Sequence, residues 1–466
     1  MIPQFHYPGV LVIVLAAGKG TRMRSRTPKV LHKVLGRSML EYVLHTIESL
    51  HPKGIAVVVG HGEEKVREHI GDPLGLDWII QEQQLGTAHA VKHCESVCRG
   101  AEHVLIVCGD TPMLDCETLT RLIDAHIDSE SSVSVLSANL DNPIGYGRIL
   151  RSKEGECLGI VEEKDANDTE RKIQEISSGI FCVRGSDLFN LLEAVKNGNV
   201  QGEYYLPDII KIALGRGLSV QAVQAEDAAC IIGINDRVQL ARVEAELQRR
   251  LIEDWQLRGV TIEQAKTVRI EATVQIGTDC LIRGGSKLIG STHLGDDCTV
   301  GPDSVIADSW LDDQVDVLAF SHIEGASIGS GSRVGPFARL RPAAELDEDV
   351  HIGNFVEVKK SVIGRESKIN HLSYIGDSSM GSGCNIGAGT ITCNYDGANK
   401  HQTIVGDRVF VGSDTKFIAP VKVGDDSTIG AGSIISRNVP EGGLTLSART
   451  DQKYVPGWER PSKKKP

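Results

Sequence analysis

Short apolar runs alternate with helix-like stretches along the first half of the chain. The apolar runs have the length of strands, are rich in β-branched residues and lie at 11–15, 55–59, 104–108, 133–136 and 180–183. Helix-like stretches separate them, as at 38–50 and 116–127. Strands that are apolar throughout and alternate with helices are typical of a parallel sheet covered on both faces. The pattern predicts an α/β domain with a Rossmann-like sheet over residues 1–236.

The stretch that follows has the spacing of a helix. Its apolar residues recur at steps of three and four with charged residues between them, and they are Leu240, Val243, Leu247, Leu251 and Trp255. One more surface helix would explain this spacing. Because the helix lies between two different patterns, a connecting arm is favoured, and we expect it at 237–260.

The second half repeats with a period of six residues. Large apolar side chains lie six apart at Ile276, Ile282, Leu288, Leu294, Val300 and Ile306, and again at Val405, Val411, Phe417, Val423, Ile429 and Ile435. Glycine often follows them, as in Ile276-Gly277 and Val423-Gly424. Neither a helix nor a flat strand has this period, whereas a triangular β-helix has one inward aliphatic residue on each short side. We predict a left-handed parallel β-helix of hexapeptide repeats over 261–449 and a tail over 450–466.

Two further features of the repeat bear on oligomer formation and on the position of a functional loop. Coils of a prism leave flat sides, which copies of the same chain can cover, so we expect a homo-oligomer through the β-helix. The six-residue phase slips where residues 392–401 intervene. Insertions in solenoids form projecting loops that often belong to the functional face.

Composition and charge narrow the class of protein. Only 4% of the 466 residues are aromatic, which suits a narrow prism core. The net charge of −12 argues against a general binder of nucleic acid or of anionic membranes. The basic stretch 1–40 contains no acidic residue and could be a targeting segment, but an apolar run typical of a buried strand precedes its cations. The 11 cysteines form no CxxC pair, so we expect free thiols in the cytoplasm.

The end of the first apolar run carries candidate phosphate chemistry. Glycines at 18 and 20 let backbone N–H groups approach a phosphate, and Arg22 and Lys29 could neutralise its charge. The motif is neither a Walker loop nor a dinucleotide fingerprint, and a simple tight turn explains the glycines equally well. Asp110 ends another apolar run, where parallel sheets bind ligands, and its oxygens suit Mg²⁺. A plain helix cap is the alternative for Asp110.

These residues resemble the signature of the sugar-1-phosphate nucleotidyltransferases. The stretch LAAGKGTRM begins at Leu15, and Pro28-Lys29 follows it. Gln81 with Leu85-Gly-Thr-Ala88 resembles the base-recognition loop of that family, and Cys108-Gly-Asp110 resembles its metal-binding strand end. With the second half included, the chain is similar nearly end to end to the bacterial bifunctional N-acetylglucosamine-1-phosphate uridylyltransferases and glucosamine-1-phosphate N-acetyltransferases.

For the first half, the resemblance implies that Asp110 and Asn235 hold Mg²⁺ while N-acetylglucosamine 1-phosphate attacks the α-phosphorus of UTP and releases pyrophosphate. Arg22 and Lys29 are the implied catalytic cations. The implied UTP and UDP-sugar contacts are Leu15, Ala16, Ala17, Gly18, Lys29, Gln81, Gly86, Thr87, Cys108, Gly109, Asp110, Gly147, Glu162, Ser177 and Asn235. One departure is Ser177, where the family usually has Asn, so a sugar contact is expected to be shorter or water-mediated.

For the second half, the resemblance rests on the stretch GAGTITCNYDGANK and on Asn370-His-Leu-Ser-Tyr374. It implies that His371 is the general base that takes a proton from the amine of glucosamine 1-phosphate as the amine attacks acetyl-CoA. The implied acceptor contacts are Arg341, Lys359, Tyr374 and Asn385, and the implied acetyl-CoA contacts are Ala388, Asn394, Tyr395, Ser413, Ala431 and Arg449. The spacing to Arg449 is one residue longer than in the family. A lone His or Lys on a prism is more often a solvated surface residue.

Two other functions compete with this interpretation. One is nucleotidyl transfer alone, with the prism serving assembly or regulation. The other is a non-catalytic interaction protein with the same two-domain plan. His371 and the loop at Asn394-Tyr395 disfavour the first, and an intact set of Lys29, Asp110 and Asn235 disfavours the second. The resemblance also implies a role in peptidoglycan and lipopolysaccharide synthesis.

Overall fold

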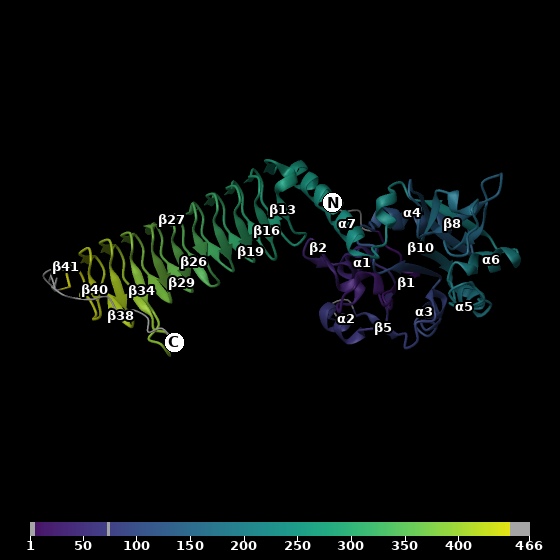
Figure 1. Ribbon diagram of the computed structural model, residues 1–466, viewed down its shortest axis with the longest axis horizontal. Helices are drawn as coiled ribbons and strands as arrows, with labels where there is room; N and C mark the ends of the chain where they lie inside the picture. Colours follow the sequence, from purple (N-terminus) through teal and green to yellow (C-terminus); the bar gives the residue numbers. More distant parts are fainter. Residues whose placement is uncertain (1–4, 72–74, 448–466) are drawn as a thin grey trace, which may run out of the picture. The chain divides into compact units, whose positions relative to one another are not determined.

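The computed structural model describes residues 5–71 and 75–447. The chain divides into two compact units, 1–247 and 248–466. The first unit contains helices on both faces of a sheet, and the second contains three long stacks of short strands (Figure 1). Each unit is described separately below.

A mixed sheet forms the centre of the first unit. Its main path, in spatial order, is β11 (Val220–Gln224), β7 (Val133–Asn139), β10 (Glu175–Arg184), β6 (His103–Cys108), β1 (Val10–Leu15), β4 (Gly54–Val59) and β5 (Asp77–Ile80). The hairpin of β8 (Gly147–Arg151) and β9 (Cys157–Val161) joins it through β10. The apolar runs of the sequence are thus strands, as predicted.

The sheet is parallel, as predicted, except at β10 and in the hairpin of β8 and β9. β10 runs antiparallel to both β6 and β7, whereas β1 is parallel to β4 and β6. Antiparallel neighbours need no helical crossover, and the segment between β7 and β10 contains the β8–β9 hairpin and a short 3-10 helix, Glu170–Lys172, but no α-helix. The connection from β7 therefore permits the antiparallel pairing of β10.

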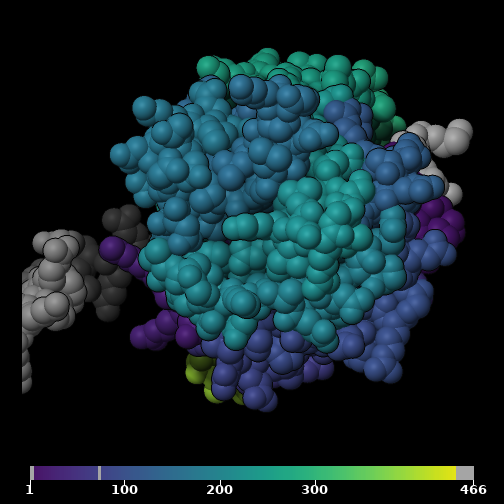
Figure 2. Space-filling model, turned by 90° about the vertical axis from the view of Figure 1, so that its right-hand side faces the viewer, coloured from purple at the N-terminus to yellow at the C-terminus, as the bar shows by residue number. Residues whose placement is uncertain are grey.

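Alternate residues of β1 enter two separate cores. Val10, Val12 and Val14 belong to the core beneath α1 (Met39–Glu48), α2 (Glu63–Ile70) and α4 (Cys116–Asp128). Leu11 and Ile13 belong to the core beneath α3 (Thr87–Lys92), α5 (Gly185–Glu193) and α6 (Asp208–Gly215). Figure 2 shows the unit from the side on which α5, α6 and β8 lie in Figure 1. Helices on both faces explain why the strands are apolar throughout.

The helix between the two patterns is α7, which spans Arg237–Leu257. Near its carboxyl end, Ile252 and Trp255 are buried and belong to the core of the second unit, together with Val260 and Ile262. The last turns of α7 thus cover the first coil of the repeat with apolar side chains.

The second unit is a left-handed parallel β-helix built from three sheets. The first sheet runs from β12 (Thr261–Ile262) to β41 (Leu444–Thr445), the second from β13 (Arg269–Ile270) to β40 (Ile434–Ile435) and the third from β14 (Gln275–Ile276) to β38 (Val421–Val423). Each strand pairs in parallel with the strand one coil later, as Ile282 does with Val300. Both of these side chains are fully buried, which confirms the prediction that the six-residue period marks one inward side chain per face.

Glycine and aspartate have different roles in the coils. The glycines that follow the inward aliphatic residues lie where coils approach closely: a Cβ on Gly353 would lie 2.0 Å from the carbonyl oxygen of Asn370. The left-handed backbone at the corners is instead often held by Asp, as at Asp297 and Asp303, whose φ values are 56° and 55°. Asp tolerates this conformation better than most side chains. Glycine is therefore required for the spacing between coils more than for their turns.

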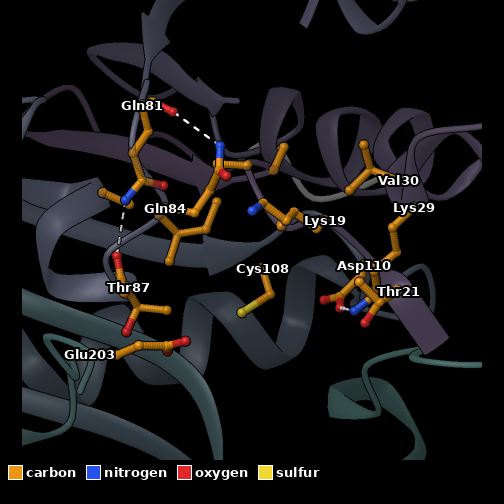
Figure 3. A pocket seen from close by; sticks show the side chains of 17 residues that line it. Lys19, Thr21, Lys29, Val30, Gln81, Gln84, Thr87, Cys108, Asp110 and Glu203 are labelled. Carbon is orange, nitrogen blue, oxygen red and sulfur yellow. Dashed lines mark hydrogen bonds and ion pairs between the residues drawn. The ribbon is translucent and has the colours of Figure 1, made fainter. Parts of the chain in front are cut away.

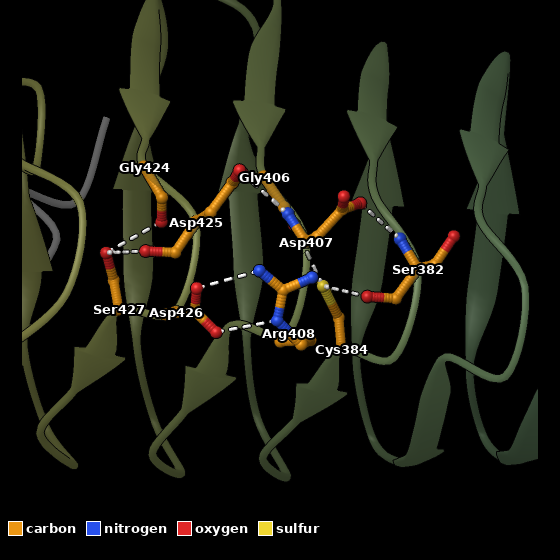
Figure 4. Close-up of polar contacts among 9 residues, drawn as sticks. All are labelled: Ser382, Cys384, Gly406, Asp407, Arg408, Gly424, Asp425, Asp426 and Ser427. Atoms are coloured by element: carbon orange, nitrogen blue, oxygen red, sulfur yellow. Dashed lines mark hydrogen bonds and ion pairs between the residues drawn. The ribbon is translucent and has the colours of Figure 1, made fainter.

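Aspartates also link successive coils through the backbone. The Oδ1 atom of Asp407 accepts from the N–H of Ser382 at 2.8 Å, and Oδ1 of Asp425 accepts from the N–H of Asp407 at 2.9 Å (Figure 4). Arg408 forms two 2.7 Å contacts with the carboxylate of Asp426 on the next coil. These contacts satisfy corner N–H groups that lie outside the three sheets.

Candidate functional site

A cavity of about 520 Å³ opens at the carboxyl ends of β1 and β6 in the first unit (Figure 3). It is lined by ten of the predicted nucleotide contacts, namely Leu15, Ala16, Ala17, Gly18, Lys29, Gln81, Gly86, Thr87, Cys108 and Asp110. Ligands of open α/β sheets bind outside the carboxyl ends of the strands, and this cavity has that position.

Two loops shape the walls of the cavity. In the glycine loop after β1, Gly20 has φ 57°, and a Cβ there would lie 2.6 Å from Cβ of Lys29. In the second loop, a Cβ on Gly86 would lie 2.4 Å from the carbonyl oxygen of Tyr204. The N–H of Ala88 donates to that same oxygen at 2.9 Å, which holds the loop in place. Both glycines are therefore required for close approach.

The amide of Gln81 is held inside the second loop. Its side chain is almost fully buried, and Nε2 lies 3.1 Å from the carbonyl oxygen of Gly86 and 3.0 Å from Nδ1 of His89. These contacts fix the orientation of the amide. In Figure 3, Gln81 and Thr87 lie on one side of the cavity and Lys29 with Asp110 on the other, with Cys108 between them.

Oxygen ligands and cations converge on the side of the cavity where Lys29 and Asp110 lie. Lys29 forms an ion pair with Asp110, and its Nζ atom also donates to Oδ1 of Asn235 at 2.9 Å. Arg22 donates to the same Oδ1 atom at 2.9 Å. The N–H of Ile234 donates to the carbonyl oxygen of Asp110 at 3.0 Å, so the two chain segments are adjacent. Residues 125 positions apart in the sequence thus share one cation.

This arrangement fits a hard divalent cation. A carboxylate and an amide oxygen already bind one ammonium group, and Mg²⁺ prefers such oxygen ligands. In the described part of the chain, no cluster of three or more His, Cys, Asp or Glu side chains could hold a metal ion. Mg²⁺ binds few protein groups and takes its remaining ligands from phosphates and water. The alternative of a helix cap is wrong for Asp110, because Asp115 caps α4.

A second group of predicted residues lies on β8, on β10 and directly after β9. Gly147 pairs with Ser177 across the sheet, and a Cβ on Gly147 would lie 3.2 Å from Oε1 of Glu162. Burial, together with the charges of Asp165 and Asp208, raises the pKa of Glu162 to about 6. These three predicted residues are therefore neighbours, although they do not line the cavity described above.

Several residues near the cavity were not among the predicted contacts. Lys19, Thr21 and Gln84 line it, and their positions beside predicted residues were the available signal. Burial raises the pKa of Tyr146, and the charge of Asp110 adds to that rise, so the phenol lies near the carboxylate. Conversely, Arg148 is fully buried and pairs with Glu163 at 2.7 Å. The guanidinium of Arg148 thus binds a carboxylate of the protein itself.

In the second unit, several predicted residues form one column along a prism edge. The column consists of the residues that directly precede a corner on consecutive coils, namely Asn354, His371, Ala388, Ser413 and Ala431. Three of these carbonyls accept from the next corner: the N–H of Leu372 donates to Asn354 at 3.1 Å, that of Asp414 to Ala388 at 2.7 Å and that of Gly432 to Ser413 at 2.8 Å. The structure therefore aligns His371 with three predicted acetyl-CoA contacts.

Two of the predicted acceptor residues, Arg341 and Lys359, lie across the second sheet from this column. Lys359 ends β28 (Glu357–Lys359), and Arg341 follows β25 (Arg339–Leu340) and binds Glu357 at 2.9 Å. Tyr374 begins β31 (Tyr374–Gly376), three residues after His371. A strand of three residues is about 10 Å long, so His371 and Lys359 of one chain occupy opposite edges of this face.

The projecting loop forms a small hairpin beside Tyr374. Tyr395 and Lys400 form an antiparallel bridge, and Nδ2 of Asn394 lies 3.5 Å from the hydroxyl of Tyr374 and 2.5 Å from Oδ2 of Asp377. Asn385 lies instead on the first sheet, in β33 (Asn385–Ile386). Arg449 and the tail at 450–466 lie outside the described residues.

Three family models match the chain. Residues 12–174 match the MobA-like NTP transferase domain, residues 402–437 match the bacterial transferase hexapeptide (six repeats), and residues 273–306 match the hexapeptide repeat of succinyl-transferase. The first match covers the cavity after β1, and the other two lie in the β-helix. None of the helices in the described ranges is long and apolar enough to cross a bilayer.

Full-length relatives share both units with this chain. The bifunctional protein GlmU of Marinobacter nauticus is 45% identical over 97% of this chain and 99% of its own length. That of Methylococcus capsulatus is 47% identical over 97% and 98%, and that of Stutzerimonas stutzeri is 46% identical over 97% and 99%. The chain therefore belongs to the GlmU family of bifunctional enzymes, which combine a nucleotidyltransferase with a hexapeptide-repeat acetyltransferase.

Proposed function

We propose that this chain makes UDP-N-acetylglucosamine in two steps at separate sites. Acetyl-CoA first acetylates glucosamine 1-phosphate, and UTP then uridylylates the resulting N-acetylglucosamine 1-phosphate. We assign uridylyl transfer to residues 1–236, a connecting arm to 237–260 and acetyl transfer to 261–449, with 450–466 as a tail. The observation that carries the first assignment is the convergence of Lys29, Asp110 and Asn235 at the cavity after β1.

In uridylyl transfer, Arg22 and Lys29 neutralise the triphosphate and the departing pyrophosphate. The sugar phosphate oxygen forms a bond to the α-phosphorus of UTP, while the bond to pyrophosphate breaks on the opposite side. Asp110 and Asn235 would hold Mg²⁺, which supplies further charge neutralisation when bound. The loop of Gln81 and Gly86 would recognise the base. Gly147, Glu162 and Ser177 would surround the sugar.

In acetyl transfer, His371 takes a proton from the acceptor amine. The amine nitrogen forms a bond to the thioester carbon, and the carbon–sulfur bond then breaks to release CoA, whose sulfur regains a proton. The backbone of Ala388 would face the developing oxyanion, since Ala388 follows His371 in the same column. Arg341 and Lys359 supply positive charge for the sugar phosphate.

We propose that the β-helix forms a homotrimer through an apolar corner stripe, defined as Phe320, Phe337, Phe355 and Leu372. These side chains are 51%, 47%, 55% and 62% exposed on successive coils. Ring centroids of the first two are 5.0 Å apart, and those of Phe337 and Phe355 are 5.3 Å apart. A continuous apolar patch of this kind is typical of an interface. His371 directly precedes Leu372, so a second copy on this stripe would bring its acceptor residues toward the first copy's base.

Reconstitution with purified full-length protein tests the whole function. Glucosamine 1-phosphate, acetyl-CoA, UTP and Mg²⁺ should yield UDP-N-acetylglucosamine by mass spectrometry. Omission of acetyl-CoA should prevent its formation, and added N-acetylglucosamine 1-phosphate should restore it. If product forms without either acetyl source, the proposed order of steps is wrong. All 11 cysteines are free thiols, so the assay should contain a reducing agent. Free thiols also support the proposal that the enzyme is cytoplasmic.

A further inference from the structure

His371 has a hydrogen-bond partner in the preceding coil. Nδ1 of its imidazole lies 2.9 Å from Oδ1 of Asn354. The two residues face each other in the parallel pairing of β27 (His351–Asn354) and β30 (Lys368–His371). Paired coils are about 4.8 Å apart, a spacing that allows two short polar side chains to meet. The contact therefore follows from the register of the prism.

The backbone around this pair is fixed. The N–H of Leu372 donates to the carbonyl oxygen of Asn354 at 3.1 Å, and the hydroxyl of Ser373 donates to the carbonyl of His371 at 2.8 Å. Gly353 lies against Asn370, where a Cβ would overlap the backbone. Neither coil can shift without loss of these contacts. The position of the Asn354 amide is thus set by the same coils that position the imidazole.

The partner of Nδ1 decides which nitrogen of His371 can act as a base. An amide oxygen only accepts, so Nδ1 carries the proton and Nε2 has the free lone pair. Resting on the assignment of His371 as the base, we propose that Asn354 is a positioning residue for acetyl transfer: it holds the Nδ1–H tautomer and aims Nε2 at the acceptor amine. Asn354 itself touches no substrate atom in this scheme.

The charge of the partner matters as well as its geometry. An amide is neutral, whereas a carboxylate at the same place would stabilise the protonated imidazolium. The other charged or titratable side chains in the cavity of about 300 Å³ that contains both residues are Arg333 and His351. Arg333 is paired with Asp316 at 3.2 Å. Asn354 thus fixes the tautomer without adding negative charge beside the base.

Two substitutions separate these effects. Asn354→Leu removes the acceptor at similar size, and we expect kcat of acetyl transfer to fall about tenfold to hundredfold, a part of what a general base contributes, with little change in KM. Asn354→Asp keeps an acceptor, so kcat on the plateau should stay within about threefold. The acid limb of its kcat–pH profile should move about one pH unit higher, because the carboxylate favours the imidazolium.

The matched control is Asn370→Asp, which places the same new charge one residue before His371 without an Nδ1 contact in the wild-type structure. Its acid limb should move clearly less than that of Asn354→Asp, since a charge without direct contact with the imidazole interacts with it more weakly. The amine of the substrate titrates equally in all variants, so it cancels in the comparison. Uridylyl transfer should be unchanged throughout, and the thermal melt of each variant reports on the folding of the prism.

The outcomes distinguish the inference from the function on which it rests. If His371→Ala retains acetyl transfer, the assignment of the base is wrong. If His371→Ala abolishes it while Asn354→Leu retains full kcat, or while Asn354→Asp leaves the acid limb in place, only the positioning role of Asn354 is overturned. An equal shift in Asn370→Asp also overturns it, because a general field would then explain the result.

Discussion

Asp110→Ala should strongly lower uridylyl transfer and leave acetyl transfer intact. Asp110 and its partner Lys29 have side chains only 19% and 13% exposed, so solvent compensates their charges incompletely. Opposite unit charges about 3 Å apart interact with about 5 kcal/mol at an effective dielectric constant of about 20. If Asn235 and water recover about half of this, the loss of about 2.5–3 kcal/mol corresponds to about a hundredfold fall in kcat/KM.

The assay follows each half-reaction separately. Pyrophosphate release from UTP and N-acetylglucosamine 1-phosphate measures the first unit, and thiol release from acetyl-CoA and glucosamine 1-phosphate measures the second. Asp168→Ala is the matched control, because that carboxylate is 99% exposed in the same unit. A fall of less than about threefold at Asp110, or an equal fall in thiol release, would refute the assignment of Asp110 to an independent uridylyltransferase site.

Three further predictions concern stability and assembly. Burial lowers the pKa of His126 to about 4, below its unfolded value of about 6.5, so the stabilisation present above pH 6.5 should be lost as the pH falls toward 4, by about 3 kcal/mol. Thermal melts of His126→Gln should show a weaker pH dependence than the wild type, and an unchanged dependence would contradict this. Gly353→Ala should destabilise the prism by at least about 2 kcal/mol in denaturant titrations, whereas Gly432→Ala, which meets open space and has φ 72°, should cost about 1 kcal/mol from backbone strain alone. Phe337→Glu should dissociate the oligomer in sedimentation velocity, and retention of the assembly would exclude the corner stripe as its interface.

The period of six was sufficient to predict the β-helix, because each inward aliphatic residue occupies one short side of a coil. The strands of the first unit were equally clear from their continuous apolar runs. The direction of β10 was not predictable, since an apolar run has the same composition whichever way it pairs. The corners also escaped prediction, because Asp and Gly both tolerate the left-handed conformation and the sequence shows only that both are frequent.

The candidate sites were likewise predicted in part from the sequence and missed in part. Asp110 stood out at a strand end, but its convergence with Asn235 on Lys29 depends on a segment that returns beside β6, where the N–H of Ile234 donates to the carbonyl of Asp110. The role of Asn354 was missed because its partner is one coil later in the sequence. Alignment of Ile352-Gly-Asn-Phe355 with Ile369-Asn-His-Leu372 could have revealed it. Local motifs thus identify the chemistry, and the register between coils identifies which groups assist it.

The loop at 394–400 shows how the prism accommodates extra residues. β32 (Ser378–Met380) still pairs with β35 (Thr403–Val405) in continuous register on either side of the loop. Residues added at a corner therefore shift the sequence period but leave the strands on either side in register with each other. Deletion of a single residue within a strand would instead turn the following aliphatic side chains outward until the next corner. Corners are consequently the places where this scaffold can acquire new substrate contacts while its core stays unchanged.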